Sequence, residues 1–212
     1  METGNWDFIK LNLQDTLKEI FNNRDIQNLS NYEKRKIIFN FLCDNVLYDY
    51  ELLNKIKDFS EGKGSVSRNT FLELLSVINE RKGICNAISQ YYKLLLEEAG
   101  IMSYCVICDD GTKVRHQLNL VYDDDQKTYS FDDVTSVIVE RGTKEEYFDY
   151  DLETANYFNQ GNVAILKDKK WVIMPEDFIS YLVGRKQTTI NNLETLPNNI
   201  ASAKQHLPSN FR

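Results

Sequence analysis

The stretch Arg81–Ile101, RKGICNAISQYYKLLLEEAGI, decides the fold of this chain because it changes from a turn into a long apolar helix. Residues at helical spacing predict one wide buried face: Ile88, Tyr91, Tyr92, Leu95 and Ala99. Gly100 follows the last of them and predicts the end of the helix. Cys85 stands where the helix begins, two residues after Gly83. We therefore expect a buried helix that carries a thiol at its first turn.

Beyond Gly100 the apolar period changes from helical to alternating, which predicts strands. The expected strands are Met102–Cys108, Val114–Tyr122 and Thr128–Val134. Their connections have turn composition, so the three segments predict an antiparallel meander. A further hairpin is expected from Asn162–Leu166 and Trp171–Met174.

Helices are expected on both sides of these strands. Residues 1–60 carry apolar positions at helical spacing, and Ser30 or Asn31 followed by Glu33 resembles a helix start. Another helix is expected over Asn69–Asn79, and Pro175 predicts a last one over about Glu176–Val183. We expect an α+β fold in which the Cys85 helix packs on an antiparallel sheet.

The domain hypothesis is a single domain over residues 1–212. Its core spans about residues 33–175, with helices in residues 1–60 and a C-terminal helix and polar tail in residues 176–212. The 42% of hydrophobic residues is enough for a core in a chain of this length.

The charge and the N-terminus exclude several classes of partner. The net charge of −7 and the scattered basic residues argue against binding to nucleic acid. No apolar run approaches the roughly 18 residues of a membrane span, and the N-terminus lacks the pattern of a signal peptide. We therefore expect a cytoplasmic protein with neither a membrane nor a nucleic acid as partner.

The four cysteines, Cys43, Cys85, Cys105 and Cys108, are expected to be reduced. A bridge between Cys105 and Cys108 inside one strand would be strained, because alternate residues point to opposite faces. The same pair lacks a second pair of ligands at zinc-finger spacing and does not stand at a helix start, as redox pairs do. We expect no metal and no organic cofactor.

Cys85, His116 and a carboxylate pair, Asp132 and Asp133, follow one another in the order of a helix start and two consecutive strands. Taken singly, a cysteine in a helix or a histidine on a strand is usually a structural residue. Together they have the layout of a thiol nucleophile with an oriented imidazole base. A helix N-terminus and an imidazolium both favour the thiolate, and Gly83 is expected to give a sharp turn and open access to the sulfur.

Strand alternation gives an expectation for the side chains. Val114, His116, Leu118 and Leu120 share a face, which we expect to pack against the Cys85 helix. Tyr129, Phe131 and Asp133 share a face that we also place toward this helix. This predicts that Asp133 contacts His116 and that Asp132 points outward or caps the strand, although a bulge at the double aspartate would exchange the two.

Three motifs resemble those of the transglutaminase-like superfamily, which has a papain-like fold, and they cover about residues 33–135. Lys82–Ser89, KGICNAIS, resembles the nucleophile motif K-G-x-C-x-[GA]-x-[AS], with Leu96–Ile101 as the helix end. His116–Asn119, HQLN, resembles H-x-W-N, with Leu118 in place of the usual tryptophan. Tyr129 followed by Asp133–Thr135 resembles an aromatic residue and then D-x-T. Glu33–Tyr50, with its Tyr48-Asp49, is similar to a helix that precedes the core of bacterial members.

The resemblance implies an enzyme in which Cys85 attacks an amide of a protein or peptide and forms a thioester. His116 would then protonate the leaving amine, and Asp133 would orient His116. Water as the second acceptor makes such an enzyme a peptidase or deamidase, and an amine makes it a transglutaminase. The alternative is a binding or scaffold module on the same fold, without catalysis.

Overall fold

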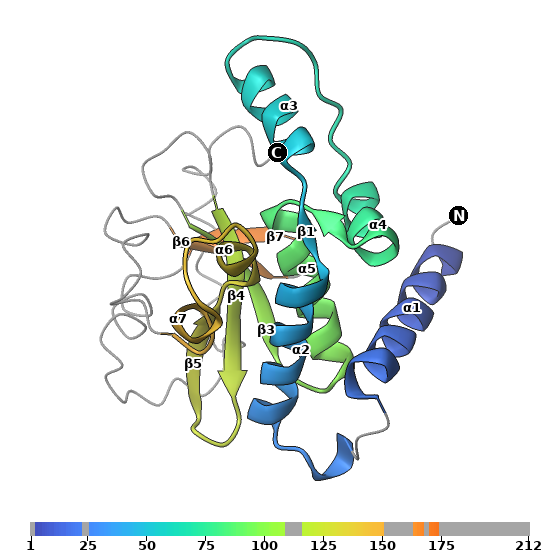
Figure 1. Ribbon diagram of the computed structural model, residues 1–212, viewed down its shortest axis with the longest axis vertical. Coiled ribbons are helices and arrows are strands. Elements are labelled where there is room, and N and C mark those ends of the chain that lie inside the picture. The colour runs from blue at the N-terminus through green and yellow to red at the C-terminus, as the bar shows by residue number, and fades with distance from the viewer. Residues whose placement is uncertain (1–2, 23–25, 109–115, 151–162, 168–169, 174–212) are drawn as a thin grey trace.

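The structure is a computed structural model that describes residues 3–22, 26–108, 116–150, 163–167 and 170–173 (Figure 1). Its helices are α1 (Thr3–Phe21), η1 (Ile26–Asn28), α2 (Asn31–Asn45), α3 (Tyr50–Ser60), α4 (Thr70–Glu80), α5 (Cys85–Glu98), α6 (Val134–Ile138) and α7 (Lys144–Tyr147). Its strands are β1 (Leu47–Tyr48), β2 (Lys82–Gly83), β3 (Ser103–Cys108), β4 (His116–Asp123), β5 (Thr128–Asp132), β6 (Val163–Lys167) and β7 (Lys170–Ile173).

A five-stranded antiparallel sheet with the order β5-β4-β3-β6-β7 forms one layer of the molecule. Helix α5 packs against β3 and β4, and α2 lies beside α5 (Figure 1). The inner face of α5 is fully buried, with Ile88, Tyr91, Tyr92, Leu95 and Leu96 at 0% exposure. The predicted α+β fold, the meander and the later hairpin are therefore confirmed.

The helix boundaries follow local signals in the sequence. Ser30 caps α2: its hydroxyl accepts a hydrogen bond from the Glu33 amide, and its own backbone amide donates to the Glu33 carboxylate. This is the capping box that the sequence predicted. After α5 the chain turns at Gly100, whose φ of 83° is readily adopted only by glycine.

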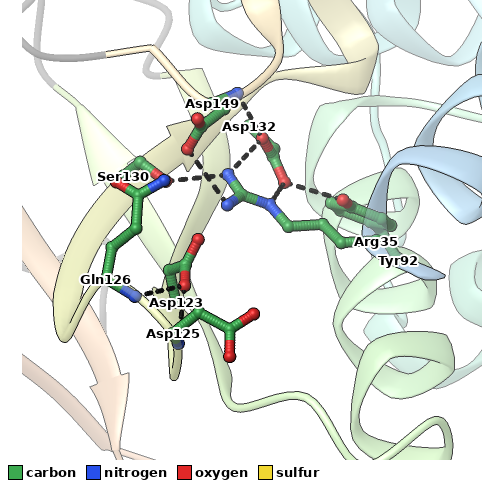
Figure 2. Close-up of polar contacts among 8 residues, drawn as sticks. All are labelled: Arg35, Tyr92, Asp123, Asp125, Gln126, Ser130, Asp132 and Asp149. Atoms are coloured by element: carbon green, nitrogen blue, oxygen red, sulfur yellow. Dashed lines mark hydrogen bonds and ion pairs between the residues drawn. The ribbon is translucent and has the colours of Figure 1, made fainter. Parts of the chain in front are cut away.

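A tight turn joins β4 to β5. The Asp123 carboxylate accepts hydrogen bonds from the amides of Asp125 and Gln126, each at 2.8 Å (Figure 2). The carboxylate thus serves as the acceptor for two turn amides that have no carbonyl partner. The turn also sets the register of β4 and β5, in which Asn119 lies opposite Asp132.

A short parallel ladder between β1 and β2 was not expected from the sequence. The Leu47 amide donates to the Arg81 carbonyl at 2.7 Å, and the Asp49 amide donates to the Gly83 carbonyl at 2.8 Å. The ladder brings Tyr48 beside Gly83, immediately before α5. Helix α3 then projects at the top of the view in Figure 1, and the chain returns through α4.

Gly83 has a different role from the predicted sharp turn. A Cβ at this position would lie 2.3 Å from Cγ2 of Val77 in α4. Gly83 is therefore needed because α4 packs closely on β2, and a side chain there would force the two elements apart.

Some expectations fall outside the described residues. The helix expected over Glu176–Val183 and the polar tail lie there, and the single-domain boundaries over 1–212 stay a prediction. Helices α6 and α7 were not expected. None of the helices that the structure describes is long and apolar enough to span a membrane.

Candidate active site

Cys85 is the first residue of α5, and its side chain is only partly exposed. The preceding residue, Ile84, offers the helix no side-chain cap, although its carbonyl accepts the amides of Ala87 and Ile88. The positive end of the helix dipole therefore lies at the sulfur without a capping carboxylate to offset it.

His116 begins β4, and its position on the strand corrects the predicted orientation of the sheet. Gln117 and Asn119 point to α5, where their side-chain amides donate to Ser89 at 2.7 Å and 3.0 Å. The face expected to meet α5, with His116 and Leu118, is therefore the opposite one. His116 reaches Cys85 because it lies at the start of the strand, next to the N-terminus of α5.

The structure brings Asp133 to His116. Nε2 of His116 lies 2.7 Å from Oδ2 of Asp133; the Asp133 side chain is fully buried, and that of His116 is 11% exposed. Asp133 also caps α6, since it accepts the amide and the hydroxyl of Ser136 at 3.0 Å and 2.6 Å. These bonds fix the carboxylate, and they leave Nδ1 of His116 for the sulfur of Cys85.

Asp132 lies elsewhere. It is fully buried and forms an ion pair with Arg35 of α2, with 2.6 Å between Nε and Oδ2. The expectation that Asp132 points outward or caps the strand is wrong, because alternation turns this carboxylate toward α2 and α5.

The electrostatics of the three residues favour a charged pair. Burial raises the pKa of the Cys85 thiol, but the hydrogen bond and charge of His116 and the Gln117 amide outweigh it, so the pKa is lowered. Burial lowers the pKa of His116, but Asp133 and Cys85 together raise it well above its ordinary value. Burial likewise raises the pKa of Asp133, but His116 and Ser136 lower it overall. Both shifts favour a thiolate beside an imidazolium.

Tyr48 is a site residue that sequence reasoning missed. Burial and the charge of Cys85 raise the pKa of the Tyr48 phenol, and the backbone amide of Cys85 is among the groups that act in the opposite direction. The Tyr48 ring also packs edge-on against Tyr50, with 5.0 Å between the centroids. The available signal was the Tyr48-Asp49 pair, but only the parallel ladder shows that this tyrosine lies close to the start of α5.

A second polar chain borders the first turn of α5. Nδ2 of Asn86 donates to Glu73 at 3.0 Å, and Arg68 holds the same carboxylate with two hydrogen bonds of 2.8 Å and 3.0 Å. The negative charge of Cys85 is among the causes that raise the pKa of Arg68. The return from α3 to α4 is thus anchored next to Cys85.

The other described thiols differ from Cys85. Cys43 and Cys105 are free, and burial is the main cause that raises the pKa of each to about 12. Among the residues that the structure describes, no cluster of histidine, cysteine and carboxylate side chains could hold a metal ion.

Comparison with known proteins rests on the fold. No family model and no curated protein matches the sequence. The crystal structure of a transglutaminase (TGase) is similar with a TM-score of 0.51 at 19% identity, over 64% of this chain and 34% of that chain. The chain has the transglutaminase-like fold. The predicted transglutaminase-like fold is therefore confirmed.

Two other solved structures are similar to this chain. One, described as a cysteine protease from Cytophaga hutchinsonii, has a TM-score of 0.42 at 19% identity, over 63% of this chain and 40% of that chain. A chain of Rad4-Rad23 bound to a 6-4 photoproduct UV lesion has a TM-score of 0.50 at 12% identity, over 96% of this chain and 51% of that chain. The chain spans about a third to a half of the length of these proteins.

Proposed function

We propose that this chain is a cysteine-dependent enzyme that transfers or hydrolyses the acyl group of an amide in a protein or peptide. The observation that carries the proposal is the contact of His116 with both Cys85 and Asp133 at the N-terminus of α5. In this proposal Asp133 orients His116 and supports its positive charge, and His116 supports the thiolate of Cys85 for nucleophilic attack.

The first half-reaction forms a thioester. The Cys85 thiolate attacks the amide carbonyl carbon, a C–S bond forms, and the carbonyl oxygen becomes an oxyanion. When the intermediate collapses, the C–N bond breaks and Nδ1 of His116 gives its proton to the leaving nitrogen. Ammonia or an amine departs, and His116 is left neutral.

The second half-reaction reverses the proton transfer. Water or an amine attacks the thioester carbonyl, Nδ1 of His116 takes the proton, and the C–S bond breaks to restore the thiolate and the imidazolium. Water gives a carboxylic acid, and an amine gives a new amide. This chemistry uses no metal and no organic cofactor.

Tyr48 and the Cys85 amide supply the donors for the oxyanion in this proposal. The Cys85 amide and the Tyr48 phenol would both donate a hydrogen bond to the substrate oxygen as its negative charge develops. The raised pKa of Tyr48 suits this role, because a neutral phenol is a donor.

The thiols of the chain provide a direct test of the proposed nucleophile. The folded protein is alkylated with iodoacetamide over about pH 4 to 9, and the labelling of each cysteine is measured by peptide mass spectrometry. We expect Cys85 to be labelled faster than Cys43 and Cys105, with a midpoint below the ordinary thiol range near pH 8.5. The variant His116→Asn is the matched control, and its midpoint should move upward. A Cys85 midpoint at or above the ordinary thiol value would refute the proposal.

A substrate test separates the two acceptors. Glutamine-containing proteins are incubated with the chain, with and without a primary amine, and the products are identified by mass spectrometry. Conversion of amide to acid indicates deamidation, incorporation of the amine indicates transfer, and new termini indicate proteolysis. The Cys85→Ala variant should form none of these products.

The second candidate is a binding module on the same fold. The similarity to the chain of Rad4-Rad23, a complex bound to a UV lesion, favours it, whereas the net charge of −7 argues against nucleic acid as the ligand. A binding module has no need of an activated thiol, so slow and uniform labelling of all the cysteines would favour this candidate.

A further inference from the structure

A buried network of charges is centred on Arg35 and Asp132, the residue before Asp133 (Figure 2). The Arg35 side chain is 2% exposed, and its Nε and Nη2 atoms each donate to Asp132 at 2.6 Å. Nη2 also donates to Ser130 at 2.9 Å, and Nη1 donates to Asp149 at 3.2 Å. The guanidinium stacks over the Phe148 ring, 4.9 Å from its centroid. Each nitrogen of the guanidinium therefore donates at least one hydrogen bond, and an aromatic ring covers one face of the group.

The Asp132 carboxylate is equally well satisfied. Besides the two bonds from Arg35, it accepts the Tyr92 hydroxyl at 2.7 Å and the Asp149 amide at 2.9 Å. Four donors on one carboxylate hold it in a single orientation.

Stability alone does not account well for such a network. Removing two charges from water is costly, and apolar residues of similar volume often stabilise a protein as well or better. What the network provides is geometry, since it joins α2, α5, the end of β5 and the segment at Asp149 in one rigid set of hydrogen bonds.

The network and the proposed active site connect the same two elements. Tyr92 follows Cys85 by seven residues, about two helical turns, so both side chains project from the same face of α5. Asp132 and Asp133 are neighbours at the end of β5, and they face opposite sides. Helix α5 is therefore linked to this strand end twice, through Cys85, His116 and Asp133 and through Tyr92 and Asp132.

We propose that Tyr92, Asp132 and Arg35 form a positioning brace, which holds the N-terminus of α5 at the distance from β5 that the contact between Cys85 and His116 requires. The inference rests on the proposed function for the role of Cys85. None of the three residues is assigned contact with a substrate.

The contact between the thiol and the imidazole is sensitive to such positioning. Hydrogen bonds weaken steeply when they lengthen or bend, and a displacement of about 1 Å in an active site can cost about 100-fold in rate. If α5 shifts away from β5, His116 supports the thiolate less well, and the pKa of Cys85 rises toward that of a buried thiol.

Two adjacent tyrosines provide a matched test. Tyr92→Phe removes the hydroxyl of the brace and keeps the ring. Tyr91→Phe removes an equally buried hydroxyl from the same helix, but one that bonds to Thr16 at 3.0 Å and Arg81 at 2.9 Å, outside the brace. Both variants should lose a similar amount of unfolding free energy, because each loses the hydrogen bonds of one buried hydroxyl. The readout that separates them is the pH midpoint for alkylation of Cys85 in the folded protein.

We expect Tyr92→Phe to raise this midpoint by about 0.5 to 1 pH unit and Tyr91→Phe to leave it unchanged. Ser130→Ala removes a single bond to Arg35 and should raise the midpoint in the same direction by less. Equal midpoints in Tyr92→Phe and wild type, or an equal shift in Tyr91→Phe, would overturn the brace. A wild-type midpoint in the ordinary thiol range would contradict the proposed function instead, because the brace is judged by the difference between variants.

Discussion

Asp132 and Asp133 are adjacent in the chain and equally buried, yet they belong to two different networks. Asp132 faces a guanidinium, which stays charged at every pH that a folded protein meets. Asp133 faces an imidazole, whose charge changes with its surroundings and with each proton transfer. The partner, and not the carboxylate, decides the role: a permanent cation makes Asp132 part of a fixed framework, and a titratable cation makes Asp133 available for chemistry. Substitutions on the two sides should therefore have different consequences.

The largest expected effect is the loss of enzymatic activity in the variant Asp133→Asn. Without the carboxylate His116 loses its orientation and the support for its positive charge, so kcat/KM should fall by about 10⁴. Asparagine can still cap α6, so the free energy of unfolding should fall far less than the activity. Steady-state kinetics on one amide substrate check this, and a loss below about tenfold would contradict the assigned role.

Asp132→Asn should act on stability first. It leaves the buried guanidinium of Arg35 without its carboxylate partner, which typically costs about 3–5 kcal/mol. Urea unfolding followed by fluorescence measures the change. A loss below about 1 kcal/mol, the value typical of an exposed ion pair, would mean that the two aspartates do not differ as described.

Tyr48→Phe tests the network of Cys85 without touching either aspartate. If its hydroxyl donates to the oxyanion, the variant should lose about 10² to 10³ in kcat. Tyr50→Phe is the control, because this ring packs against Tyr48 and its side chain is exposed. Similar kinetics for both variants would remove Tyr48 from the proposed mechanism.

The smallest effect concerns the dependence of stability on pH. The pKa of Asp133 is lowered, so its contribution is present above its unfolded value of 3.8 and is lost as the pH falls through the folded pKa. The pKa of His116 is raised, so its contribution is present below 6.5 and is lost as the pH rises through the folded pKa. The destabilisation by Asp133→Asn should therefore be greatest between about pH 4 and 6.5.

Above this window the two aspartates should differ again. The penalty for Asp132→Asn should persist at higher pH, because Arg35 remains charged, whereas that for Asp133→Asn should decline as His116 loses its proton. Urea unfolding of both variants at a series of pH values tests this, and parallel curves would argue against it.

The sequence predicted the contact between His116 and Asp133 through two errors that compensate. We placed His116 on the face of β4 toward α5, and Phe131 with Asp133 on the corresponding face of β5. Both assignments are reversed, since Gln117 and Asp132 face the helices. Alternation fixes which residues share a face but not which face is covered, because β4 is buried on both sides. The contact between His116 and Asp133 requires only that both side chains lie on the same side of the sheet, whichever side that is.

Arg35 and Tyr48 could not have been found in this way. The residues around Arg35 show a helical pattern, and nothing in that pattern distinguishes a buried arginine from an exposed one. Tyr48 comes to the nucleophile through a ladder with a segment more than thirty residues away in the chain, and two-residue strands leave no periodic signal. Local patterns predicted most of the elements and the position of Cys85 at a helix start, whereas the partners of Cys85 come from long-range packing.

The two-residue ladder also makes the molecule suitable for insertion. The segment between β1 and β2 leaves the body through α3 and returns through α4, so the ladder and the packing of α4 on β2 fix its ends whatever the length of the turn between α3 and α4. At its turn, a Cβ added to Gly62 or Gly64 would meet nothing within 4 Å, and each doubling of a loop costs only about 0.6 kcal/mol in closure entropy. A peptide tag or a reporter domain inserted between these glycines would leave the ladder, and therefore Tyr48 and Cys85, in position. This turn is therefore a suitable insertion site for engineering the protein.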